Sequence, residues 1–267
     1  MEKNIILAFA LTAFAGLATG IGSAMAFFSR RTNKSFLSVA LGFSAGVMIY
    51  VSFVEIVSKA RESLSASSTP SVGEWLTVIS FFAGMLVIMI VDFLVPAPEN
   101  PHSLHTVEEE ADPDQKNRHL LRTGTFTALA IAIHNFPEGI ATFAAALEDP
   151  ALGWSIAVAV AIHNIPEGIS VSVPVFFATG SKNKAFWLSF LSGLSEPLGA
   201  AVGYGLFRAF FSPKTFGFVF AGVAGIMVYI SLDELLPAAR EYGKSHLVIG
   251  GVIAGMAVMA LSLLLFK

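Results

Sequence analysis

The sequence predicts an all-α integral membrane protein with eight transmembrane helices. Its first three and last three helices should form inverted triplets that flank a central pair of proline-kinked helices. Three observations predict this fold. Of the 267 residues, 55% are hydrophobic and only 13% are charged, far more apolar than a water-soluble domain. Eight apolar windows have about the 20 residues that a helix needs to cross a bilayer, and two segments of these windows occur twice.

The eight windows form one transmembrane domain that spans residues 1–267. They cover residues 5–28, 36–57, 75–95, 124–147, 153–177, 186–208, 216–238 and 247–266. The first window is too long for a secretory signal and has Glu2 beside Lys3, so we expect it to be a mature helix. The only long connection, residues 96–123, is rich in proline and acidic residues and holds three histidines. This composition predicts a solvated, disordered linker.

The distribution of basic residues predicts the orientation in the membrane. Ten Lys and Arg residues follow the first, third, fifth and seventh windows, and six lie on the other side. Because basic loops resist translocation, both termini should lie outside and the 96–123 linker in the cytoplasm. The partners expected are the lipid bilayer and ions, with no nucleic acid. The oligomeric state is left open, with a homodimer as one option.

One repeat relates the two triplets. The segment AGVMIYVSFVEI at 45–56 returns as AGIMVYISLDEL at 224–235, which indicates a duplication that pairs the second window with the seventh. These two windows cross in opposite directions under the predicted topology, so the triplets are inverted. Inverted repeats are a recurring transporter architecture, with the binding site near the membrane midplane.

The second repeat carries the chemistry. HNFPEG at 134–139 is followed 29 residues later by HNIPEG at 163–168. On a helix His134, Asn135 and Glu138 project to one side, because they are three and four residues apart. Each proline cannot donate to the carbonyl four residues before it, so we expect each helix to be kinked. The glycine that follows each glutamate permits close helix approach.

The copy of this motif supplies His163, Asn164 and Glu167. Two such faces, packed together, offer two imidazoles, two amides and two carboxylates, a set that suits one or two divalent cations. The alternative is that these groups only satisfy the backbone of kinked helices. A buried carboxylate in lipid costs about 2.5–3.5 kcal/mol or more, and placing one beside a histidine twice is a poor way to satisfy backbone.

Further acidic residues lie within the windows, whereas Lys and Arg are absent from them except for Arg208 at an end. A cation is therefore the missing partner. Glu196 precedes a proline and is placed near the site. Lower-ranked candidates for a transport pathway are Met48, Glu55, Asp92, Asp233 and Glu234. For Met48 simple packing is the alternative, and for Asp92 a solvated helix cap. The linker histidines could capture metal or only be solvated.

The paired HN-x-PEG motifs, SEP at 195–197 and LDELLP at 232–237 resemble the ZIP metal-ion transporters across essentially the whole chain. The resemblance implies an importer in the bacterial inner membrane, with a binuclear site shared by the fourth, fifth and sixth windows. It implies Zn²⁺ as the first substrate and Fe²⁺, Mn²⁺, Co²⁺ or Cd²⁺ as further ones, with no prosthetic cofactor. By position, one ion would bind His134, Glu138, Glu167 and His163, and its neighbour Asn135, Glu138, Asn164, Glu167 and Glu196.

Two other classes of function fit the sequence less well. An intramembrane metallohydrolase needs an open metal position, an activated water and a general base, and the sequence lacks His-Glu-x-x-His or a serine triad signature. The other is a channel or structural membrane module that uses no metal. We therefore expect a transporter and not an enzyme.

Overall fold

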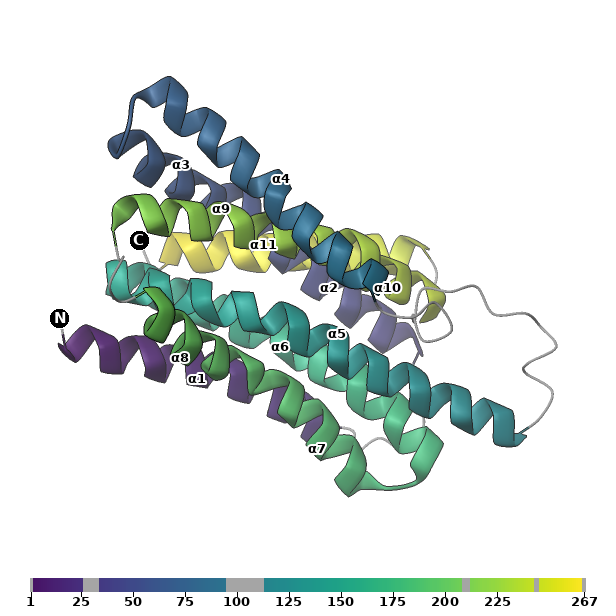
Figure 1. Ribbon diagram of the computed structural model, residues 1–267. Coiled ribbons are helices and arrows are strands. Elements are labelled where there is room, and N and C mark those ends of the chain that lie inside the picture. The colour runs from purple at the N-terminus through teal and green to yellow at the C-terminus, as the bar shows by residue number, and fades with distance from the viewer. Residues whose placement is uncertain (1, 26–33, 95–112, 208–211, 243–244, 266–267) are drawn as a thin grey trace.

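The computed structural model describes residues 2–25, 34–94, 113–207, 212–242 and 245–265, which form helices joined by short connections and contain no strand (Figure 1). The elements are α1 (Glu2–Met25), α2 (Lys34–Val51), the π-helical turn η1 (Ser52–Ile56), α3 (Val57–Ala66), α4 (Pro70–Leu94), α5 (Pro113–Glu148), α6 (Pro150–Thr179), α7 (Lys182–Gly193), α8 (Ser195–Phe207), α9 (Pro213–Ile230), the π-helical turn η3 (Ser231–Leu235), α10 (Leu236–Tyr242) and α11 (Ser245–Leu265).

Local sequence signals set the ends of the central helices. Asp149 accepts a hydrogen bond from the backbone N–H of Ala151 at 2.9 Å, and Pro150 follows as the first residue of α6. Both features favour a helix start. Gly180 ends α6 in the left-handed conformation with φ 64°, which glycine adopts without steric cost. Short, capped connections therefore hold α5, α6 and α7 side by side.

Every predicted window overlaps a helix or a run of consecutive helices. Six segments of the described chain are long and apolar enough to cross a membrane: 4–24, 38–66, 70–93, 150–173, 213–240 and 245–265. The α5 segment carries polar residues at its centre, and α7 and α8 have only 12 and 13 residues. The all-α membrane fold is therefore confirmed, whereas the eight-crossing arrangement stays a prediction.

The helices gather in two halves (Figure 1). The centre half contains α1, α5, α6, α7 and α8, and the flanking half contains α2, α3, α4, α9, α10 and α11. The halves meet where α6 packs on α2 and where α5 packs on α9. In its most apolar window, α6 has 78% of its residues buried, against 17% for α4. The α6 helix is thus an inner helix, and α4 presents most of its surface outward.

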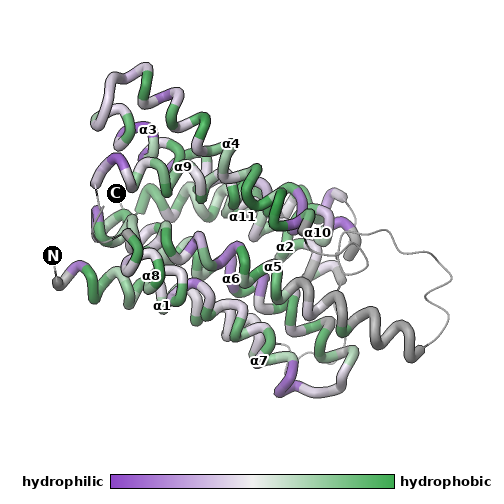
Figure 2. Tube along the Cα trace, in the orientation of Figure 1, coloured by the Kyte–Doolittle hydropathy of each residue, from purple (hydrophilic) through white to green (hydrophobic). Residues whose placement is uncertain are grey.

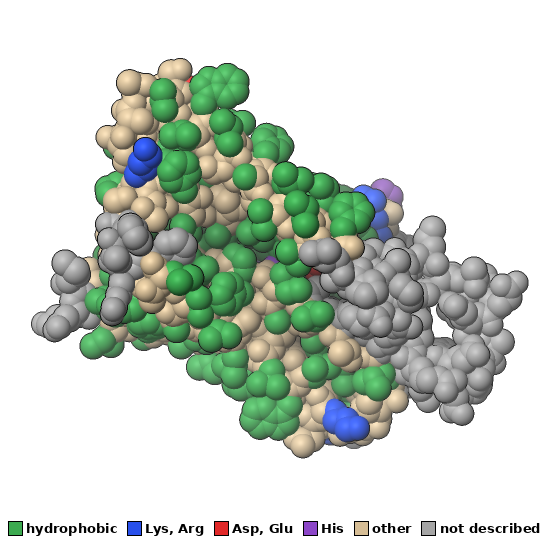
Figure 3. All heavy atoms as spheres, in the orientation of Figure 1, with side chains coloured by type: hydrophobic (Ala, Val, Ile, Leu, Met, Phe, Trp, Pro, Cys, Tyr) green, Lys and Arg blue, Asp and Glu red, His purple; other side chains and the backbone are tan. Residues whose placement is uncertain are grey.

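Hydrophobic side chains are spread over the whole described part of the face shown in Figure 3, and the Lys and Arg side chains lie near its ends. Hydrophilic stretches occur instead within α5 and α6 (Figure 2). The labelled N and C ends lie at one end of the bundle, opposite the end where α5 begins (Figure 1). This distribution is the reverse of a water-soluble protein and fits a bilayer environment.

Three boundaries differ from the sequence prediction. The α5 helix begins at Pro113, within the predicted linker, and most of that linker lies outside the described residues. Pro137 and Pro166 lie inside α5 and α6, which each continue through the motif, so the predicted kinks do not break these helices. The interruption falls instead at Leu194, between α7 and α8. Pro197 cannot donate to the carbonyl of Gly193, which lies four residues before it.

The two copies of the AG-x-M segment share an unexpected feature. Each runs as an α-helix into a π-helical turn, η1 at Ser52–Ile56 and η3 at Ser231–Leu235, and then resumes as an α-helix. The turns occupy matching positions of the repeat. π-helical turns are rare and frequently lie at functional sites. Their shared placement supports the equivalence of the two segments.

Candidate metal centre

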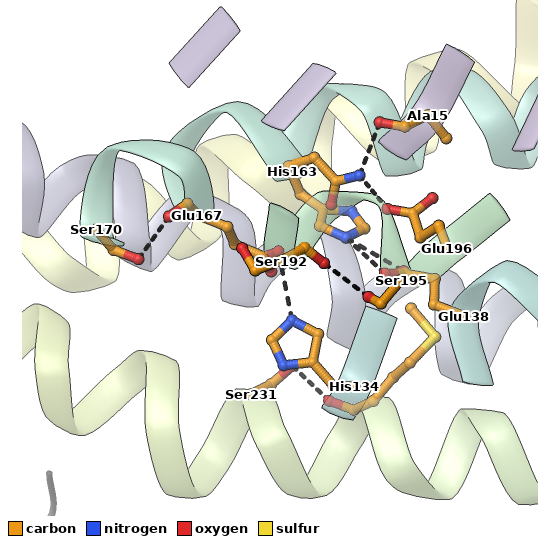
Figure 4. Close-up of polar contacts among 12 residues, drawn as sticks. Ala15, His134, Glu138, His163, Glu167, Ser170, Ser192, Ser195, Glu196 and Ser231 are labelled. Carbon is orange, nitrogen blue, oxygen red and sulfur yellow. Dashed lines mark hydrogen bonds and ion pairs between the residues drawn. The ribbon is translucent and has the colours of Figure 1, made fainter. Parts of the chain in front are cut away.

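The HN-x-PEG motifs of α5 and α6 meet in crosswise pairs (Figure 4). His134 of α5 faces Glu167 of α6, with 3.3 Å between Nε2 and Oε2. His163 of α6 faces Glu138 of α5, with 3.1 Å between Nε2 and Oε1. Each helix thus gives an imidazole to the carboxylate of the other, as the spacing of four residues within each motif allows.

Two further helices complete the centre. The side-chain amide of Asn164 donates to a carboxylate oxygen of Glu196 at the start of α8, and to the backbone carbonyl of Ala15 in α1 at 2.8 Å. The sequence correctly placed Glu196 beside the motifs. It gave no sign of α1, because a backbone carbonyl has no side-chain signature.

All seven predicted ligands are at most 3% exposed to solvent: His134, Asn135, Glu138, His163, Asn164, Glu167 and Glu196. Several of their atoms have no hydrogen-bond partner among the described residues, including both amide atoms of Asn135, both carboxylate oxygens of Glu167 and Oε2 of Glu196. Buried polar groups are normally paired. The cluster therefore offers lone pairs to a further partner, and residues 123–180 encode no Lys or Arg to supply it.

The glycines of the motifs fix how closely the helices approach. A Cβ atom on Gly139 would lie 2.0 Å from the carbonyl oxygen of Glu196, and one on Gly168 would lie 2.2 Å from that of Thr19. No side chain fits in either place. The predicted close approach is confirmed, and its partners are α8 and α1.

The donor set suits a divalent cation. Among the described residues no three His, Asp or Glu side chains already converge as a metal site. Two ligands at about 2.0–2.1 Å from a tetrahedral ion lie about 3.3–3.4 Å apart. The crosswise N–O distances of 3.1 and 3.3 Å are close to this spacing, so the histidine and the glutamate of each pair could bind the same ion with little movement.

The lower-ranked pathway candidates lie at different places. Met48 is fully buried in the large hydrophobic cluster. Glu234, in η3, lies near enough to His134 to act on it electrostatically. Asp92 and Asp233 act in the same way on Tyr229. Glu55 lies in η1 and is partly exposed.

Comparison of the sequence with known proteins shows the family to which this chain belongs. A model described as ZIP Zinc transporter matches residues 96–263, more than half of the chain. This chain belongs to the ZIP family. Its relatives include three proteins with the name "Zinc transporter ZupT". The one from Nitratidesulfovibrio vulgaris is 63% identical over 99% of both chains, that from Chlorobium chlorochromatii 61% over 100% of both, and that from Clostridium perfringens 60% over 99% of this chain and 97% of its own.

Membership confirms what the motifs predicted. A ZIP chain is a multi-pass membrane transporter and not an enzyme, so the metallohydrolase and the structural module are excluded. In this family the zinc is a transported substrate and not a prosthetic group.

Proposed function

We propose that this chain imports divalent metal ions across the bacterial cytoplasmic membrane, with Zn²⁺ as the first substrate, through the centre between α5 and α6. The names of its relatives support zinc as the substrate. One observation carries the choice of site: two crosswise His–Glu pairs, fully buried, with unpaired donor and acceptor atoms around them. Such a group in a membrane interior calls for a cation.

The proposed centre is binuclear. One ion takes His134, His163, Glu138 and Glu167, and both glutamates extend to a neighbouring ion. That second ion also takes Asn135, Asn164 and Glu196. Carboxylates can bridge two ions because each has two oxygens.

The route through the membrane uses all eight helical segments, with both termini outside. The two labelled termini at one end of the bundle support an even number of crossings. The proposed groups along the ion path are the acidic residues of the π-helical turns, Glu55, Asp233 and Glu234, together with Asp92 and Met48. Fe²⁺, Mn²⁺, Co²⁺ and Cd²⁺ are further candidate substrates, because N and O ligands accept several metals.

Uptake by the purified full-length chain tests the proposal. The chain is reconstituted in sealed vesicles loaded with a metal-sensitive dye, and Zn²⁺ is added outside. We expect saturable Zn²⁺ uptake by vesicles that contain the wild-type chain. Vesicles without protein, and vesicles with an equal amount of the Glu167→Ala variant, should show no such uptake. The proposed function would be refuted if the wild-type chain transported none of the five metals.

A further inference from the structure

The centre is built on a pseudo-twofold relation between two helix pairs. In α1 the segment GLATGIG at 16–22 corresponds to GLSEPLG at 193–199, which leads into α8. A Cβ on Gly22 would lie 2.0 Å from the carbonyl oxygen of Ile165, and a Cβ on Gly199 would lie 2.0 Å from that of Phe136. Ile165 and Phe136 are the same position of the two motifs.

The reverse contacts follow the same relation. Gly168 of α6 faces the carbonyl of Thr19, and Gly139 of α5 faces the carbonyl of Glu196. The segments also touch each other: a Cβ on Gly193 would lie 2.6 Å from Oγ1 of Thr19, and one on Gly16 would lie 3.3 Å from Cβ of Glu196. Thus α1 packs on α6 as α8 packs on α5, and Thr19 is the counterpart of Glu196.

The relation holds for the backbone but not for the side chains. Asn164 bonds both Glu196 and the carbonyl of Ala15. Its counterpart Asn135 has no hydrogen-bond partner for either amide atom among the described residues, and Oγ1 of Thr19 has none either. Asn135 and Thr19 are both 0% exposed. Two unpaired polar groups therefore occupy the positions that mirror a bonded pair.

We propose that Thr19 is a further residue of the ion site, and holds a water that completes the coordination of the second ion opposite Glu196. An ion on the pseudo-twofold axis receives ligands in matched pairs, Asn135 with Asn164 and Glu138 with Glu167. Glu196 then requires a counterpart, which is Thr19. The threonine hydroxyl is shorter than a glutamate carboxylate by two bonds, about 2.5 Å, close to the size of one water molecule.

The consequence is a site with unequal sides. The Glu196 side carries an extra carboxylate, whereas the Thr19 side supplies only neutral oxygen ligands. A second ion that is held less tightly on one side leaves more readily, which a transporter requires. This inference rests on the proposed function, because it needs metal to bind at the centre.

Metal titration of the full-length chain in lipid nanodiscs tests it, with Zn²⁺ and calorimetry. We expect two binding events, and Glu196→Gln identifies the event that belongs to the second ion. Thr19→Val should weaken that event roughly 10- to 100-fold, the usual cost of removing an outer ligand partner, and should leave the other event unchanged. Thr19→Ser keeps the hydroxyl and should bind like the wild type.

Ser262→Ala is the matched control, because it removes another buried hydroxyl without a partner, in α11 of the flanking half. Neither Thr19→Val nor Ser262→Ala should destabilise the fold, since an unpaired buried hydroxyl contributes nothing to it. The inference is overturned if Thr19→Val binds both ions with wild-type affinity or loses affinity equally for both. It is also overturned if the wild type binds one ion only. Loss of the proposed function would differ: the wild type would bind no metal, or Glu167→Ala would bind it normally.

Discussion

The two halves of the molecule bury different things. Among the described residues, each buried His, Asn and Glu belongs to the centre half, whereas the buried polar groups of the flanking half are serines and a threonine. Their backbones pack alike. A Cβ on Gly225 of α9 would lie 2.0 Å from the carbonyl oxygen of Phe81, and a Cβ on Gly139 would lie equally close to the carbonyl oxygen of Glu196. Close helix packing is therefore common to both halves, and the side chains alone distinguish the one that binds ions.

The largest effect should come from removing a central carboxylate. Glu138→Ala and Glu167→Ala should each lower initial zinc uptake by about 100-fold or more, since the loss of a charged ligand costs several kcal/mol. Asn164→Ala should lower uptake less. The measurement is uptake into vesicles at matched protein levels, with Glu74→Ala, an exposed residue of α4, as the control. Normal uptake by Glu138→Ala would place the ion elsewhere.

External pH should act through the centre half. A histidine must be neutral to bind a metal, and its ordinary pKa is about 6.5. Protons and metal therefore compete, so apparent zinc affinity should fall by about tenfold or more on acidification from about pH 8 to 5. Titration of uptake against zinc at each pH measures this. An affinity that stays constant over the range would contradict binding by His134 and His163.

A matched pair of glycine changes separates packing from chemistry. Gly139→Ala and Gly225→Ala insert the same methyl against a backbone carbonyl, and each should destabilise the fold by about 1–3 kcal/mol. Only Gly139→Ala moves Glu196, so only this variant should lose metal affinity, by roughly tenfold. Thermal unfolding and metal titration report the two effects separately. Equal affinity losses would mean that the halves are not distinct in function.

The π-helical turns of the flanking half allow a finer comparison. Glu234→Gln removes a negative charge that acts on His134. This variant should lower the apparent zinc affinity a few-fold. Its counterpart Glu55→Gln should change entry of the ion without weakening binding at the centre. Equilibrium binding and initial uptake rates, measured on both variants, distinguish these roles. A larger binding loss in Glu55→Gln would reverse the assignment.

The smallest effect should come from the linker. Deletion of residues 102–111 removes two of its histidines but leaves α5 intact. We expect uptake to fall by no more than about twofold, because the segment lies outside the ion-binding helices. Complete loss of uptake in a deletion variant that still reaches the membrane would show that the linker histidines are essential.

The sequence predicted those features that side chains encode. Helical spacing within HN-x-PEG and its repetition brought His134, Glu138, His163 and Glu167 to one centre, and the proline after Glu196 correctly placed that residue near it. It missed features of the backbone. The carbonyl of Ala15 and the π-helical turns depend on packing between distant helices, which local periodicity does not report.

The crosswise pairs have a consequence for the return of the emptied carrier. Under the proposed function, each turnover must end with a centre that holds no ion. The three carboxylates of Glu138, Glu167 and Glu196, left bare in hydrocarbon, would penalise that state heavily. Because Nε2 of His134 and of His163 each lies within 3.3 Å of a carboxylate oxygen, an imidazole that takes up a proton as the ion departs can pair at once with the glutamate opposite it. The cost of resetting is lowered by the ligands themselves, so the step after release need not limit the rate of the cycle.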